Sequence, residues 1–339
     1  MIGLRLNQTL RGSIPFVGFW LLMVSLPEAV FPQEITRLRY GITASTVHLP
    51  VMAARDGGLF TKYGLDVEVI HMRGGSLIIT GLLSGTLQIS GVGTEPTVSA
   101  RLEGGEAILL ACPIDTSPVY FITRPEIRSA AELKGKASAV TRLGTGTHFY
   151  LRTSLIKLGL DPDKDMTILQ VGTAGEMAAA LERGNIAAAA LTFRDALSFR
   201  QRGWPVLVDL TKIDFAYPPS CVVSSIGYVR DNPAIVERFL KAYIEAILLI
   251  KKDHGFAERV LSKWFRETDP VILKKTIEAY ADLFKPIPYV PDKGIDLVLT
   301  ELSARRPAAK KFMGRPEYFR NHGPLDKLVK DGWIDQVSK

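Results

Sequence analysis

The sequence predicts an α/β protein built from two lobes of similar plan. After about residue 37, short apolar runs alternate with helical stretches, which is the pattern of a parallel sheet with helices between its strands. The same order of strand, loop and helix returns about a hundred residues later. The chain has 339 residues, of which 47% are hydrophobic and 23% charged, so two packed cores can form.

Residues 1–33 differ from the rest of the chain and predict a signal peptide. Arg5 and Arg11 precede an apolar run at residues 14–26, which is too short for a membrane span and typical of a signal-peptide core. An uncleaved N-terminal membrane anchor is the alternative. We therefore expect a periplasmic protein, secreted through this segment.

The elements of the first lobe follow from apolar runs and their terminators. We expect strands at residues 38–42, 66–71 and 87–92. A helix at residues 49–60 is predicted to close at Gly57 and Gly58. Ser76 is the expected N-cap of a second helix that runs to Leu83.

The second lobe repeats this order. Strands are expected at residues 137–140, 167–171 and 186–191, and a helix at 149–158. Thr173 and Glu176 form a T-x-x-E capping box, which predicts a helix beginning there.

The C-terminal third is helical and supplies packing elements. Amphipathic patterns predict helices at residues 234–251, 256–265, 270–284 and 294–302. Strand-like crossings at residues 119–123 and 221–229 would join the lobes. Lobe one would then be discontinuous, with residues 38–122 and 226–339, and lobe two would hold residues 123–225.

Composition limits the functional classes. The net charge is +7, but no basic stripe with interleaved aromatic residues indicates nucleic-acid binding. The sequence has no G-x-S-x-G, HExxH or C-x-x-C motif and no metal-ligand spacing, so we expect no enzyme activity, cofactor or metal. Cys112 and Cys221 either pair or remain two buried thiols, and both interpretations stay open.

The candidate binding residues lie in loops that follow predicted strands. The loop Gly144-Thr-Gly-Thr-His-Phe lacks the third glycine of a dinucleotide fingerprint, and no G-K-[ST] follows. A hydroxyl-rich turn at a helix N-terminus suits a small anion; an ordinary capped turn is the alternative. The loop at residues 43–48 echoes it in lobe one, with His48 matching His148.

Three further loops complete the predicted site. Arg73 follows a strand and could grip an acid group, although a solvated surface arginine is the alternative. Glu95 could accept a hydrogen bond from the ligand or cap a helix. The predicted ligand-binding residues are Thr43, Ser45, Thr46, His48, Arg73, Gly74, Ser76, Gly93, Thr94, Glu95, Thr145, Gly146, Thr147, His148, Thr192 and Phe193.

Four stretches carry a family resemblance: residues 41–65 with their Gly58-Leu-Phe and Gly64-Leu, residues 83–89, the segment Ile127-Arg-Ser-Ala-Ala-Glu-Leu-Lys-Gly-Lys136, and residues 144–148. Through them the chain resembles the substrate-binding proteins of ABC importers. The group includes nitrate, taurine and aliphatic-sulfonate binders and the NMT1/THI5-like pyrimidine synthase proteins. The resemblance implies a type 2 periplasmic-binding fold, with a two-strand hinge and a ligand in the cleft between its lobes.

This resemblance implies a periplasmic solute-binding component of an ABC importer. It would capture a small anion, sulfonate-, taurine-, nitrate- or carboxylate-like, by hinge closure, and deliver it as a monomer to a permease and its ATPase. The alternative is a pyrimidine-precursor binding protein or a synthase-like enzyme of thiamine metabolism. The Cys-rich motif of the synthase branch is not found in this sequence.

Overall fold

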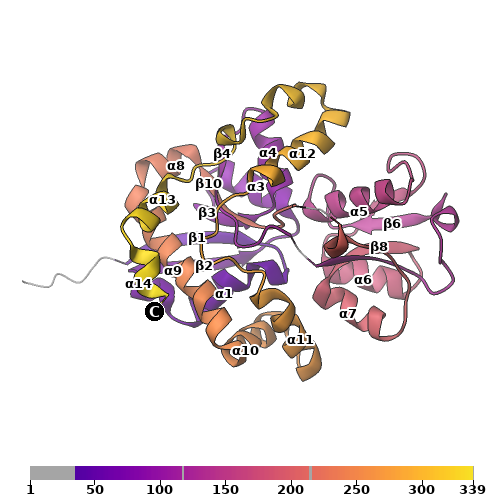
Figure 1. Cartoon of the computed structure of the whole chain (residues 1–339), viewed down its shortest axis with the longest axis horizontal. Coiled ribbons are helices and arrows are strands. Elements are labelled where there is room, and N and C mark those ends of the chain that lie inside the picture. Colours follow the sequence, from indigo (N-terminus) through magenta and orange to yellow (C-terminus); the bar gives the residue numbers. More distant parts are fainter. Residues whose placement is uncertain (1–34, 117, 214–215, 339) are drawn as a thin grey trace, which may run out of the picture. The chain divides into compact units, whose positions relative to one another are not determined.

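Two five-stranded mixed sheets organise the computed structural model, which describes residues 35–338 apart from 117 and 214–215 (Figure 1). The predicted signal peptide lies outside the described residues. Sheet A has the strand order β2-β1-β3-β10-β4, and sheet B the order β7-β6-β8-β5-β9. The predicted α/β class is confirmed.

Sheet A holds the three strands predicted for lobe one and two more. Its strands are β1 (Thr36–Ile42), β2 (Leu65–His71), β3 (Ile89–Val92), β4 (Ala107–Ala111) and β10 (Cys221–Ser225). β1 runs parallel to β2 and β3, whereas β10 is antiparallel to β3 and β4. The carboxyl ends of β1, β2 and β3 therefore meet at one edge of the sheet.

Sheet B repeats this arrangement. Its strands are β5 (Val119–Thr123), β6 (Ala137–Val140), β7 (Thr167–Gln170), β8 (Ala188–Thr192) and β9 (Val206–Asp209). β6 runs parallel to β7 and β8, and β5 is antiparallel to β8 and β9. Each sheet thus brings three parallel strand ends together.

Helices surround both sheets. Those that follow parallel strands are α1 (Leu49–Asp56), α2 (Leu59–Lys62), α3 (Gly75–Leu83), α4 (Thr94–Leu102), α5 (Gly146–Lys157), α6 (Ala174–Glu182) and α7 (Phe193–Gln201), with the 3-10 turn η1 (Thr46–His48) before α1. The C-terminal helices are α8 (Ile226–Asp231), α9 (Pro233–Lys252), α10 (His254–Phe265), α11 (Pro270–Ala281), α12 (Asp292–Arg305), α13 (Gly323–Lys330) and α14 (Trp333–Val337). Further 3-10 turns are η2 (Ala131–Leu133), η3 (Leu210–Lys212), η4 (Pro307–Phe312) and η5 (Pro316–Tyr318).

Several predicted helix boundaries are wrong: α11 ends at Ala281 rather than at residue 284, and α12 extends beyond the predicted 294–302 at both ends. The helix expected at residues 49–60 is two helices, because Gly58 has a φ of +68° and interrupts the hydrogen-bond ladder. α3 begins at Gly75 with Gly74 as its N-cap, so Ser76 lies inside the first turn. α5 begins at Gly146, three residues earlier than predicted.

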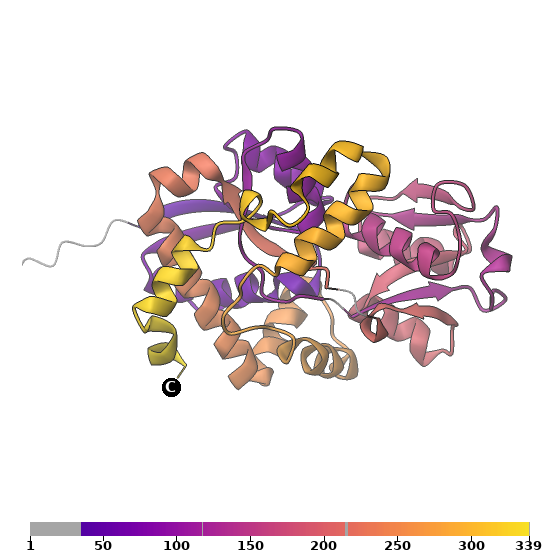
Figure 2. The same cartoon turned by 45° about the horizontal axis from the view of Figure 1, so that its top comes forward.

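The C-terminal helices complete lobe one, which here means sheet A with α1–α4 and α8–α14; lobe two means sheet B with α5–α7 (Figure 2). α9 packs against α1 and α2, and its buried residues share one apolar core with β1 and β2. Among the described residues, no helix combines the length and apolarity that a membrane crossing requires.

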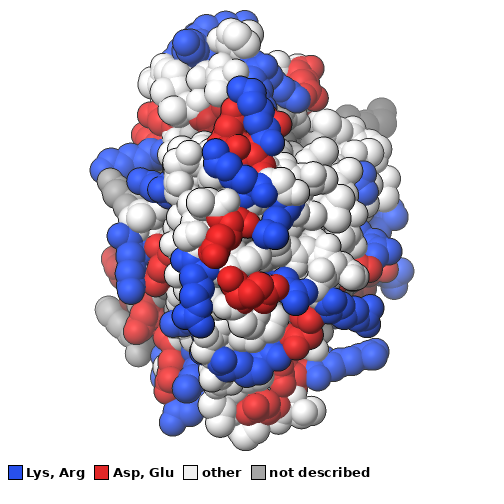
Figure 3. Space-filling view, turned by 90° about the vertical axis from the view of Figure 1, so that its right-hand side faces the viewer, with Lys and Arg blue, Asp and Glu red and all other residues white. Residues whose placement is uncertain are grey.

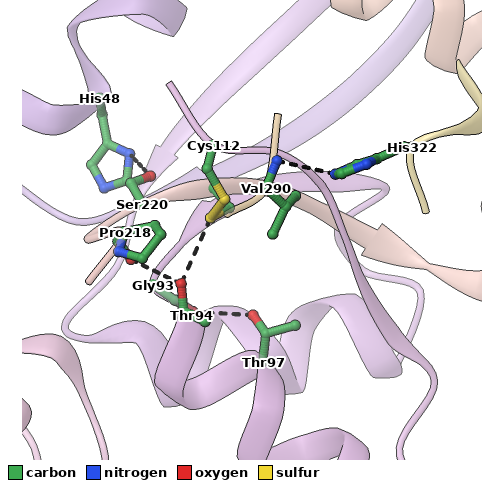
Figure 4. Close-up of a disulfide and its surroundings, with 10 residues drawn as sticks. His48, Gly93, Thr94, Thr97, Cys112, Pro218, Ser220, Val290 and His322 are labelled. Carbon is green, nitrogen blue, oxygen red and sulfur yellow. Dashed lines mark hydrogen bonds between the residues drawn. A yellow bond between two sulfur atoms is a disulfide. The ribbon is translucent and has the colours of Figure 1, made fainter. Parts of the chain in front are cut away.

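The chain passes between the sheets twice, after β4 and before β10. Residues 119–123, predicted to cross between the lobes, form β5 within sheet B. Of the predicted crossing at 221–229, residues 221–225 form β10 within sheet A and 226–229 lie in α8. The boundaries predicted at 122/123 and 225/226 therefore assign most of β5 to lobe one and all of β10 to lobe two, which the strand pairing contradicts. Cys112 and Cys221 form a disulfide with a Cα–Cα distance of 4.1 Å, which settles the alternatives left open by the sequence (Figure 4). The bridge joins the two crossings where they leave sheet A.

Candidate functional site

Six helix N-termini face one cavity of about 190 Å³. They follow the carboxyl ends of the three parallel strands of each sheet, where open α/β sheets bind ligands. Their N-cap residues all line the cavity: Ser45 for η1, Gly74 for α3, Gly93 for α4, Thr145 for α5, Thr173 for α6 and Thr192 for α7. Helix N-termini offer backbone N–H donors and the positive end of the helix dipole, so this arrangement favours an anion.

Five of these six caps accept no side-chain hydrogen bond from a backbone amide of their own helix; the exception is Thr173, which accepts from the Glu176 amide. A threonine N-cap ordinarily accepts from the second or third helical N–H. The Thr145 hydroxyl instead donates to the Arg142 carbonyl at 2.7 Å, and the Thr192 hydroxyl donates to Asp195 Oδ2 at 3.0 Å. The first-turn amides of α5 and α7 are thus left for another acceptor.

Three threonine hydroxyls form a triangle on the lobe-two wall. Oγ1 of Thr141 lies 3.2 Å from that of Thr145 and 2.9 Å from that of Thr147, and the last two are 3.2 Å apart. The Thr147 hydroxyl also accepts from the Thr141 amide at 3.0 Å. Because Thr145 commits its proton to a carbonyl, Thr141 and Thr147 hold the remaining hydroxyl protons for the triangle and for a bound acceptor.

His48 is the buried polar group of the lobe-one wall. Its Nε2 lies 3.1 Å from Thr43 Oγ1, and its Nδ1 lies 3.2 Å from Ser220 Oγ (Figure 4). Burial, and then the charge of His71, lowers the pKa of His48 to about 3, so the ring is neutral near pH 7. Gly91 makes room for it, because a Cβ there would lie 2.6 Å from His48 Nδ1.

The charged side chains of the wall are paired. Arg73 Nη2 donates to Glu176 Oε1 at 2.5 Å, which links lobe one to lobe two. Asp195 accepts from Arg194 at 2.6 Å. The attraction for an anion therefore comes mainly from backbone amides and hydroxyls. The described residues contain no His, Cys, Asp and Glu group that could hold a metal ion.

Ten of the sixteen predicted residues line this cavity. They are Thr43, Ser45, His48, Arg73, Gly74, Gly93, Thr145, Gly146, Thr147 and Thr192. Among the residues that the sequence did not indicate, Thr141 and Asp195 add polar atoms, and Val47, Met72 and Tyr150 add apolar surface. Thr141 directly follows β6, so its position after a strand end could have indicated it as a site residue. Nothing in the sequence indicates Tyr150.

Six predicted residues lie outside the cavity. Thr46 is buried within η1, and Thr94 donates to the Pro218 carbonyl at 3.0 Å (Figure 4). Phe193 packs against the cores of both lobes. The other three, Ser76, Glu95 and His148, line neighbouring hollows. Nδ1 of His148 accepts from the Gly144 amide at 3.1 Å.

The comparisons with known proteins agree with this geometry. A family model described as NMT1/THI5 like matches residues 45–253, and the chain belongs to this family. It is 25% identical to the provisionally named binding protein YtlA of Bacillus subtilis over 98% of this chain and 99% of that protein. The taurine-binding periplasmic protein of Escherichia coli K12 is 27% identical over 71% of each chain.

Solved structures show the same fold. The periplasmic nitrate-binding protein NrtA of Synechocystis PCC 6803 superposes with a TM-score of 0.74 at 16% identity, over 90% of this chain and 91% of that chain. The two-lobed periplasmic-binding fold expected from the resemblance is therefore confirmed.

Proposed function

We propose that this protein is the periplasmic solute-binding component of an ABC importer and captures a small singly charged anion in the cavity between its sheets. The convergence of six helix N-termini on one cavity carries this proposal. The nitrate-binding protein is named for a monoanion, and the taurine-binding protein for a zwitterion that carries one sulfonate group.

Closure of the lobes would couple binding to delivery. A solute that contacts the amides of α5 from lobe two and the loop at residues 43–48 from lobe one stabilises the arrangement in which both are near. The closed form would then dock on a membrane permease driven by an ATPase. The predicted signal peptide and the disulfide both suit the periplasm.

The paired charges favour a monoanion. Arg73 and Asp195 are each neutralised by an opposite charge, so the wall offers no free cation to balance a second negative charge. Val47, Met72 and Tyr150 would contact an apolar body on the solute. A short sulfonate or carboxylate combines both features.

We infer that the site binds without catalysis. Ser220, His48 and Thr43 form a hydrogen-bonded row, but no carboxylate orients the ring within it. With its pKa lowered to about 3 by burial, His48 is a poor base near pH 7.

A binding screen tests the function. Thermal unfolding and calorimetry with ethanesulfonate, taurine, nitrate, acetate and a hydroxymethylpyrimidine should show one of the monoanions raising the melting temperature with no product formed. Thr147→Ala should abolish most of that shift, and Thr147→Ser should retain it. Stabilisation by the pyrimidine alone, or product formation, would favour the thiamine-metabolism alternative.

A further inference from the structure

Glu95, the second residue of α4, is a buried carboxyl at the boundary between the lobes. The residue is 1% exposed, and its Oε2 has no hydrogen-bond partner among the described residues. An ionised carboxylate in such a place is unfavourable unless a cation compensates it. The proposed anion cavity does not use this group.

Lobe two contributes to the cover of this carboxyl. α4 contacts α5, and a Cβ on Gly144 would lie 3.9 Å from Glu95 Oε1. The hollow beside Glu95, of about 470 Å³, is lined by Ser76 of lobe one and by Leu143 and Gly144 of lobe two. Separation of the lobes would open this side of Glu95 to water.

The cations near Glu95 are held by other acids. Arg152 of α5 donates to Asp163 and, at 2.6 Å, to Glu301 of α12. Arg305 pairs with Glu301 at 2.8 Å, and Arg306 pairs with Glu103 of α4. The titratable and charged groups that face Glu95 are Arg152 and His148 of α5, Glu301 and Arg305 of α12, Arg306 after it, and Tyr217 of the second crossing. Glu95 thus has no counter-ion of its own.

We propose that Glu95 couples lobe closure to the uptake of one proton: its carboxyl is neutral when lobe two covers it and ionised when the lobes part. The pH dependence of closure follows from the burial of Glu95 and requires no solute. Its coupling to solute capture rests on the proposed function.

Burial, and then the Glu301 carboxylate, raises the pKa of Glu95 to about 7 from the ordinary value of 4.5. Because the value is raised in the covered state, closure is favoured at low pH. As the pH rises from 4.5 to about 7, the contribution of Glu95 to the closed-to-open ratio should fall by up to about tenfold per unit, and it should level off above.

His148 opposes this effect. Burial, and then the charges of Arg305 and Arg152, lowers the pKa of His148 to about 4 from 6.5, so closure expels a proton from this ring below pH 6.5. Between about pH 4.5 and 6.5 the two contributions offset each other, so the net fall in the closed-to-open ratio is expected above about pH 6.5. A Glu95 variant separates the two contributions, because it removes the uptake and keeps the release.

Small-angle X-ray scattering and carboxyl-selective NMR on the ligand-free protein test the proposal. From about pH 6.5 to 8.5 the radius of gyration of the wild type should increase, and one glutamate signal should titrate near pH 7. In Glu95→Gln that signal should be missing and the increase should be lost. The matched control Glu68→Gln removes an exposed carboxylate of the same lobe that is not among the groups facing Glu95, and it should behave as the wild type.

Two results would overturn the proposal. One is a wild-type protein whose glutamates all titrate below about pH 6, which would mean that Glu95 is solvated. The other is a signal near pH 7 without any change in the radius of gyration, which would mean that the carboxyl is buried within lobe one alone. Both measurements use the wild type, so they decide the matter even where Glu95→Gln fails to fold. Neither depends on a solute, so a failed binding screen leaves them informative.

Discussion

The two lobes bring equivalent strand ends to the cavity but line it with different types of residue. Lobe one begins α3 and α4 with Gly74 and Gly93, and the buried His48 forms part of its wall. Lobe two begins α5, α6 and α7 with threonines and adds Thr141 to the hydroxyl triangle. Glycine lets the backbone approach a solute closely, whereas hydroxyl groups bind only solute atoms that can donate or accept hydrogen bonds in the right direction. We infer that lobe one determines the size and shape of the solute that fits, and that lobe two determines which hydrogen-bonding groups the solute carries.

The surface of lobe two shows no comparable specialisation. On the face seen in Figure 3, Lys and Arg side chains alternate with Asp and Glu side chains, without a continuous basic stripe. The difference between the lobes is concentrated at the cavity, where four substitutions can test it.

The largest effect should come from acid titration of His48. Its pKa is lowered to about 3 in the folded state, so the stability it contributes is complete above pH 6.5 and is lost as the pH falls. The loss should approach about 1.4 kcal/mol per pH unit between these values. Urea unfolding at pH 7 and pH 5 should show a smaller drop for His48→Gln than for the wild type. His254→Gln, which removes an exposed histidine, should match the wild type.

The second effect should come from the close packing of lobe one. A Cβ at Gly91 would lie 2.6 Å from His48 Nδ1 and 2.9 Å from the Tyr40 hydroxyl, so Gly91→Ala should cost about 1–3 kcal/mol of unfolding free energy. At Gly146 of lobe two the nearest atom would be 3.4 Å away, so Gly146→Ala should stay within about 0.5 kcal/mol of the wild type. If Gly91→Ala and Gly146→Ala lowered the unfolding free energy equally in chemical denaturation, the proposed difference between the two lobes would be contradicted.

The hydroxyl triangle of lobe two should affect affinity more than stability. Thr147→Ala removes a donor to the solute and the acceptor of the Thr141 amide, so binding of the best monoanion should weaken by about 1–2 kcal/mol in calorimetry. Thr147→Ser retains both contacts and serves as the control. A matching loss in Thr147→Ser would show that the methyl group, rather than the hydroxyl, matters.

The smallest effect should come from the ion pair between the lobes. The side chains of Arg73 and Glu176 are 63% and 45% exposed, so Arg73→Ala should change the unfolding free energy by less than about 1 kcal/mol. Added salt should reduce that difference further. A change well above this limit at low salt would show that Arg73 has a larger part in holding the lobes together.

The sequence could predict most of the elements that position the cavity. Strand ends and helix starts leave local signals, such as the capping pair Thr173 and Glu176, which the structure confirms. Pairing of Cys112 with Cys221 could not be decided, because it depends on β4 and β10 entering the same sheet from positions 109 residues apart.

The histidine echo shows why site residues were harder to predict. His48 is the third residue of the 3-10 turn η1, and His148 is the third residue of the α-helix α5. A 3-10 turn has three residues per turn and an α-helix 3.6, so the same position after the N-cap gives a different side-chain direction. The same residue type at matching positions of the two loops therefore did not mean that the two side chains point the same way.

The disulfide has a mechanical consequence. The bond between Cys112 and Cys221 closes the intervening chain, which includes all of sheet B, into a covalent loop whose two ends are attached to lobe one. Force applied to the two ends of the protein would bypass that loop and load only lobe one. After reduction, extension should lengthen by an added step on the order of 350 Å as the freed segment unravels.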